Sequence, residues 1–168
     1  TIADSGAAVN VRAGSSLTID GGNFSGGKKN TISSNGTVEI CGGNFDQKPS
    51  DNYVADGFKA VENNGKWYVV GEEMDAVVSS TSEFAAALAS GNNLYLAAGE
   101  YKMPAGNNFS SDDIIVCDAG TVFTGNSKLN INGATIVGAT FSNPSGSAVD
   151  QTINGTFKDC VFEGANAL

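Results

Sequence analysis

Few side chains in this sequence could act as a catalytic base. There is no histidine and a single arginine, Arg12, so proton transfer would depend on carboxylates, lysine or tyrosine. Paired carboxylates can hydrolyse glycosidic bonds, and Asp112 and Asp113 are the adjacent acidic pair of the second half. Consecutive residues on a strand point to opposite faces, so such a pair seldom converges on one substrate atom. We therefore expect Asp112 and Asp113 to form a solvated corner, and we predict no catalytic residue.

The cysteines and aspartates do not show the spacing of a metal site. Cys41, Cys117 and Cys160 are odd in number and far apart, unlike a disulfide framework or a zinc site. We expect three free, buried thiols. Asp118 and Asp159 lie at non-equivalent repeat positions, which disfavours a calcium-binding ladder of carboxylates. The sequence therefore predicts no metal and no cofactor.

Four aromatic side chains are predicted to bind a glycan. Aromatic rings can stack on sugars, but near the end of a β structure they more often cover the core. The four residues are Trp67, Tyr68, Tyr95 and Tyr101.

Charge and composition exclude several classes of partner. The formal net charge is −9, which would repel a phosphate backbone, so we expect no nucleic acid partner. No apolar run reaches the roughly 18 residues of a membrane span, and no basic amphipathic helix is present, so we expect no membrane insertion. The first residue is Thr1, which suggests a processed chain or a fragment. The 22 glycines and 18 asparagines suit short strands joined by tight corners.

A repeat of 21 residues indicates how these strands are arranged. Residues 17–24 return as residues 38–45 with an identical Gly-Gly-Asn-Phe ending. A fixed period near 20 is typical of a solenoid. We therefore expect Leu17, Ile19 and Phe24 to stack on the corresponding residues of the next coil, about 4.8 Å away.

The same period returns in the second half. Ile115, Ile136 and Phe157 are separated by 21 residues each, and we expect them to form one interior column. Two further sets share this spacing: Asp118, Ala139 and Cys160, and Ala119, Thr140 and Val161. We expect Ile136, Ala139 and Phe141 to align with Phe157, Cys160 and Phe162, which places all six side chains inside.

Two segments that break the period are predicted to cover the stacks. Residues 58–70 contain Asn64-Gly65, a pair that suits a tight hairpin turn, and carry Trp67 and Tyr68. Ser80 and Glu83 match a capping box, so we expect a helix of about two turns that ends at Gly91.

These features resemble known β-helical proteins. The helix, the strand pattern of residues 94–101 and the motif of residues 157–162 resemble the first coils of the pectin-lyase-like superfamily. The Gly-Gly-Asn-Phe repeats, residues 53–61 and the hairpin resemble the repeat-and-cap segments of surface proteins from gut bacteria and of phage tailspike or fibre proteins. The resemblance implies a right-handed parallel β-helix. Lyases of that superfamily often use an arginine base, whereas Arg12 lies outside the coils that resemble them.

We predict an all-β protein with two domains. Residues 1–72 would form β-helix coils with a hairpin cap, and residues 73–168 a capping helix followed by the first coils of a second β-helix. The expected function is a structural or adhesive segment of a virion appendage or capsid-surface protein, located outside the cell. It would form a homo-oligomer or join neighbouring subunits through uncapped coils near Phe162 and Leu168. The alternative is a bacterial cell-surface glycan-binding module, or a fragment of a polysaccharide lyase or glycosidase.

Overall fold

The chain forms a β-solenoid of about six turns with roughly 21 residues per coil, which confirms the predicted parallel β-helix. It divides into two compact units, Thr1–Glu73 and Met74–Leu168, called unit 1 and unit 2 below. No helix in the described residues is long and apolar enough to cross a membrane. The computed structural model describes residues 7–26, 31–91, 93–102, 108–109, 112–124, 130–131, 133–143 and 155–164.

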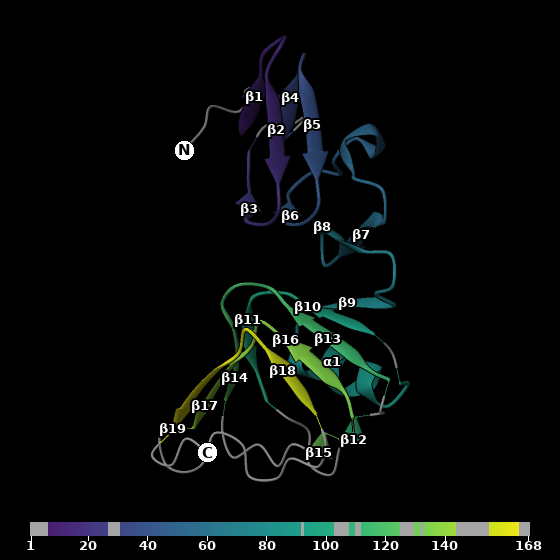
Figure 1. The fold of residues 1–168 in the computed structure, drawn as a ribbon, viewed down its shortest axis with the longest axis vertical. Helices are drawn as coiled ribbons and strands as arrows, with labels where there is room; N and C mark the ends of the chain where they lie inside the picture. Colours follow the sequence, from purple (N-terminus) through teal and green to yellow (C-terminus); the bar gives the residue numbers. More distant parts are fainter. Residues whose placement is uncertain are drawn as a thin grey trace. The chain divides into compact units, whose positions relative to one another are not determined.

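Unit 1 consists of short parallel strands followed by a hairpin (Figure 1). Its elements are β1 (Val9–Val11), β2 (Ser16–Ile19), β3 (Asn23–Phe24), β4 (Ile32–Ser34), β5 (Thr37–Ile40), β6 (Asn44–Phe45), a 3-10 helix η1 (Asp51–Tyr53), β7 (Phe58–Asn63) and β8 (Lys66–Gly71).

The strands of unit 1 pair in the register that the repeat predicts. Leu17 pairs with Val38 and Ile19 with Ile40. The rings of Phe24 and Phe45 stack with centroids 4.9 Å apart and planes 10° apart. The 21-residue repeat therefore places chemically similar side chains directly on one another.

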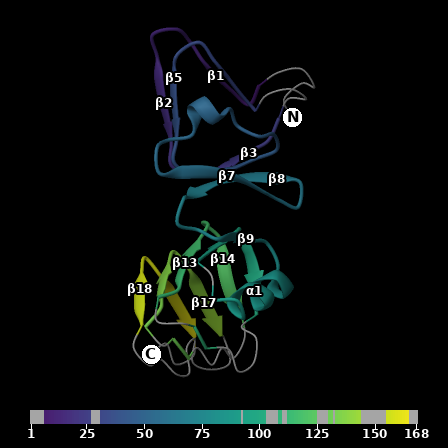
Figure 2. The same cartoon turned by 90° about the vertical axis from the view of Figure 1, so that its right-hand side faces the viewer.

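The hairpin of β7 and β8 joins the stack at its last coil (Figure 2). Its turn contains Asn64 and Gly65 with φ values of 50° and 77°, a conformation that Asn and Gly tolerate at low cost. β8 pairs antiparallel with β6, and Trp67 packs against the core of unit 1. This confirms the predicted hairpin turn.

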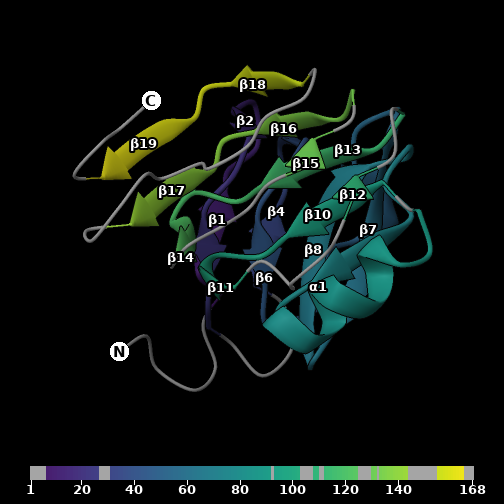
Figure 3. The ribbon, with the colours of Figure 1, turned by 90° about the horizontal axis from the view of Figure 1, so that it is seen from below.

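Unit 2 begins with a strand and a helix and continues as stacked coils (Figure 3). Its elements are β9 (Ala76–Val78), α1 (Thr81–Leu88), β10 (Leu94–Leu96), β11 (Gly99–Tyr101), β12 (Asn108–Phe109), β13 (Ile114–Cys117), β14 (Thr121–Thr124), β15 (Asn130–Ile131), β16 (Thr135–Val137), β17 (Thr140–Asn143), β18 (Thr156–Lys158) and β19 (Val161–Gly164).

The helix α1 packs its apolar side against the first coil. The hydroxyl of Ser80 accepts a hydrogen bond from the amide of Glu83, as a capping box requires. The Glu83 carboxylate, however, accepts from the amide of Ser79 rather than from that of Ser80. Phe84 and Leu88 are buried in the core of unit 2. A helix of eight residues is too short to be stable alone, so this packing stabilises it.

Two parallel sheets form the main walls of unit 2, and Figure 3 shows their strands side by side. Ile115 pairs with Ile136 and Ile136 with Phe157, which confirms the predicted interior column. In the other sheet, Thr140 of β17 has a partner in each neighbouring strand. It pairs with Val161 in β19 and with Val122 in β14. The 21-residue spacing of Ala119 and Thr140 therefore does not correspond to a strand pairing, because the corner before β14 is longer than the corresponding corner before β17.

Candidate functional site

Asp112 and Asp113 lie in different environments. Asp112 is exposed, whereas Asp113 is 5% exposed. The carbonyl of Asp113 accepts a hydrogen bond from the amide of Thr135 in the next coil, at 2.9 Å. The prediction of a solvated corner is wrong for Asp113, because the chain turns inward at this residue just before β13. The two carboxyl groups do not share one solvent-facing site.

The four aromatic residues predicted to bind glycans also differ in exposure. Tyr101 is 1% exposed, and its hydroxyl lies 2.7 Å from the carbonyl oxygen of Ala97. Tyr68 is also buried, so neither ring offers a free face to a sugar. This corrects the prediction for these two residues. Trp67 and Tyr95 are half-buried.

The three thiols are free, as predicted. Burial raises the pKa of the Cys117 thiol well above its ordinary value of 9.0. Cys41 and Cys160 are only half-buried, which differs from the expectation for them. Cys160 packs against the core of unit 2. Within the described segments, no three His, Cys, Asp or Glu side chains are placed to hold a metal ion.

The last described coil of unit 2 has the features of an assembly edge. β18 and β19 are the outermost described strands of their sheets. Phe157 and Phe162 occupy its interior positions and are half-buried. Val161, on the outward face of β19, is 50% exposed. We call strands β18 and β19 the coil edge. Leu168, the other predicted assembly residue, lies outside the described residues.

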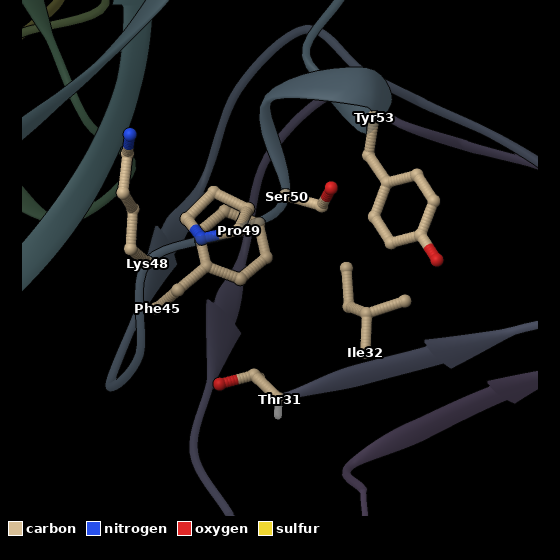
Figure 4. A pocket seen from close by; sticks show the side chains of 7 residues that line it. All are labelled: Thr31, Ile32, Phe45, Lys48, Pro49, Ser50 and Tyr53. Atoms are coloured by element: carbon tan, nitrogen blue, oxygen red, sulfur yellow. The ribbon is translucent and has the colours of Figure 1, made fainter. Parts of the chain in front are cut away.

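A small hollow in unit 1 is a second candidate site, and it combines polar and apolar side chains (Figure 4). Its volume is about 260 Å³. Its polar lining comprises Thr31, Lys48, Ser50 and Tyr53. Its apolar lining comprises Ile32, Phe45 and Pro49.

The amino-acid sequence alone does not predict this hollow. Its residues come from two places, the start of β4 and the segment from the end of β6 to η1. The second segment interrupts the 21-residue repeat. This interruption is the one feature of the sequence that could have indicated the hollow. The pairing of Val54 with Ile40 shows that the chain rejoins the stack directly after η1.

Stacked parallel coils with a hairpin and a helix packed on them define a β-solenoid protein. Comparison with protein families, with curated proteins and with solved structures found no match to this chain. The coil edge and the hollow are the two features of the described residues that bear on function.

Proposed function

We propose that this chain is a structural or adhesive β-helical segment of a virion appendage or capsid-surface protein, and that it assembles through its coil edge without enzymatic activity. The observation that carries the proposal is the position of Phe157 and Phe162. Both side chains belong to the interior columns of unit 2 and are only half-buried in the outermost described strands.

The edge of a parallel sheet presents backbone N–H and C=O groups that can pair with another strand. A neighbouring coil would satisfy these groups and cover the two phenylalanine rings, and burial of apolar surface contributes about 25 cal/mol per Å². The partner we propose is a second copy of this chain, because unit 1 also presents parallel strands, β2 and β3, at the outside of their sheets.

The proposed setting is outside the cell, on a virion or on a bacterial surface. It is supported by the resemblance of the repeats and the hairpin to surface proteins of that kind. A solenoid in which each coil contacts its neighbours is an extended scaffold suited to fibres and appendages. The net charge of −9 disfavours non-specific association of such units.

A glycan-binding module of a bacterial cell surface is the second candidate. The hollow in unit 1 favours it, because hydroxyl groups and apolar side chains line the same space. The two candidates involve different units and can be tested separately.

Sedimentation velocity over a range of concentrations tests the assembly. We expect the mass of the wild-type chain to increase with concentration, and Phe162→Lys to lower the association because a charge would be buried at the coil edge. Phe162→Leu is the matched control and should still associate. A wild-type chain that stays monomeric throughout, or a folded Phe162→Lys variant that associates normally, would refute the proposal.

A further inference from the structure

Among the described residues, one hydroxyl group that lines the hollow in unit 1 has no hydrogen-bond partner. Thr31 is 3% exposed, and its Oγ1 is a buried atom with no hydrogen-bond partner among the described residues. Buried hydroxyls are nearly always paired, so an unpaired one that lines a cavity marks a position for a missing partner. A hydrogen-bonding group of a ligand can supply that partner.

Two further residues that carry hydroxyl groups, in η1 and directly before it, line the same hollow. Ser50 is the N-cap residue of η1, yet its side chain makes no capping hydrogen bond. Tyr53, at the end of η1, also lines the hollow, and Figure 4 shows its side chain beside those of Ser50 and Ile32. Each of these hydroxyls can donate one hydrogen bond and accept others. The polar lining therefore matches a ligand whose groups also both donate and accept.

The charges around the hollow favour a neutral ligand. Lys48 lines the hollow, but its ammonium lies 2.8 Å from Oδ1 of Asp51 and is therefore already paired. The same ammonium lies 5.6 Å from the centre of the Trp67 ring. An anionic ligand would have to displace Asp51 and approach a chain of net charge −9.

The size and the apolar lining restrict the ligand further. A volume of about 260 Å³ lies just below the range of about 300–1,000 Å³ that is typical of drug-sized ligands, so one small ring fits better than an extended chain. Ile32 and Pro49 supply apolar contacts, and Tyr53 supplies part of an aromatic ring. Neutral sugars carry hydroxyls around their rim and C–H groups on their faces, and they match both kinds of lining.

We propose that the hollow formed by Thr31, Ser50 and Tyr53 binds one neutral saccharide unit. Hydroxyls of the sugar pair with Thr31 Oγ1 and with the hydroxyls of Ser50 and Tyr53, while a C–H face lies against Ile32 and Pro49. This site differs from the four aromatic residues that the sequence suggested. It rests on the second candidate function, the glycan-binding module, and it does not depend on assembly through the coil edge.

The test is an NMR titration of the isotope-labelled full chain with methyl glycosides of neutral hexoses, 6-deoxyhexoses and N-acetylhexosamines. We expect at least one saccharide to give saturable shifts of the Thr31, Ser50 and Tyr53 amides at millimolar concentration. Thr31→Val and Tyr53→Phe should each weaken binding about 2- to 10-fold, as expected for one hydrogen bond. Both substitutions keep the shape of the side chain, so the fold should persist.

Thr37→Val is the matched control, because Thr37 is an exposed threonine of β5 in the same unit. It should leave the affinity unchanged. The absence of shifts at the hollow with every saccharide would mean that water alone occupies it, and the proposal would be wrong. Shifts that persist equally in Thr31→Val and Tyr53→Phe, or binding of small peptides in place of sugars, would also overturn it.

Discussion

The ring of Phe162 stacks on the ring of Phe141, with centroids 5.2 Å apart and planes 9° apart. Phe141 in turn stacks on Phe123 at 5.1 Å, with planes 15° apart. The first pair is 21 residues apart in the sequence and the second is 18. The column thus stays continuous although the coil length changes, which indicates that interior contacts determine the register of the stack.

Phe141 should therefore contribute more to stability than the phenylalanines of the coil edge. It is 0% exposed and lies between two rings. Phe141→Ala should lower the free energy of unfolding by about 3–5 kcal/mol, measured by urea denaturation followed through amide signals of unit 2. Phe157→Ala, at a half-buried position, should lower the free energy of unfolding clearly less than Phe141→Ala does. Equal losses in the two variants would contradict this difference in packing.

Gly36 and Gly21 should respond differently to the same substitution. A Cβ atom at Gly36 would meet the carbonyl oxygens of Arg12 and Ser15, whereas one at Gly21 would meet nothing within 4 Å. Gly36→Ala must move the backbone of the neighbouring coil, and we expect a loss of at least about 1–3 kcal/mol, as for overpacking. Gly21→Ala should lie within about 1 kcal/mol of the wild type. Thermal denaturation monitored by circular dichroism compares the two, and a tolerated Gly36→Ala would disprove the close approach of these coils.

The sequence predicted the parts of the fold in which chemically similar residues recur at a fixed interval. The columns of Ile115 and Ile136 follow from that interval, because strands in adjacent coils must place apolar residues inside. The pairing of Val122 with Thr140 did not follow from it. Corners face outward, so a coil can gain or lose residues there without disturbing its strands. The hollow at Thr31 was unpredictable for a related reason, since it depends on how two separate segments meet in space.

The Cys117 thiol should make the stability of unit 2 depend on pH in alkaline solution. Burial, with smaller contributions from Cys160 and Asp118, raises the pKa of Cys117 above its ordinary value of 9.0. Above about pH 9 the unfolded chain loses this proton while the folded chain keeps it, so the unfolded state binds fewer protons. The free energy of unfolding should therefore fall with rising pH, by about 1.4 kcal/mol per unit for this group. Below that pH the contribution is fully present.

Urea denaturation of the wild type and of Cys117→Val between neutral pH and pH 10 measures this effect. The valine variant lacks the thiol but fills a similar space, so the difference between the two chains isolates Cys117 from the other titrating groups. A difference that does not change with pH would show that the thiol reaches solvent in the folded protein.

Asp113 and Asp112 provide the last prediction, which separates a structural role from a catalytic one. Asp113 is buried beside the start of β13, so Asp113→Ala should lower the free energy of unfolding by about 1–3 kcal/mol. Asp112 is exposed, and Asp112→Ala should change stability by less than about 0.5 kcal/mol. Both values can be measured by urea denaturation. We also expect the wild-type chain to release neither unsaturated products nor new reducing ends from polygalacturonate.

These outcomes are linked, because a carboxylate pair that acts on a polysaccharide must reach one substrate from both residues. One buried and one exposed carboxylate do not meet that requirement in this structure. Polysaccharide cleavage that is lost in Asp112→Ala, a variant expected to be fully folded, would identify a catalytic role and support the lyase or glycosidase alternative. If only Asp113→Ala loses stability and no variant cleaves the polysaccharide, Asp113 serves the packing of the coil. Assembly and ligand binding are then the functions to be tested.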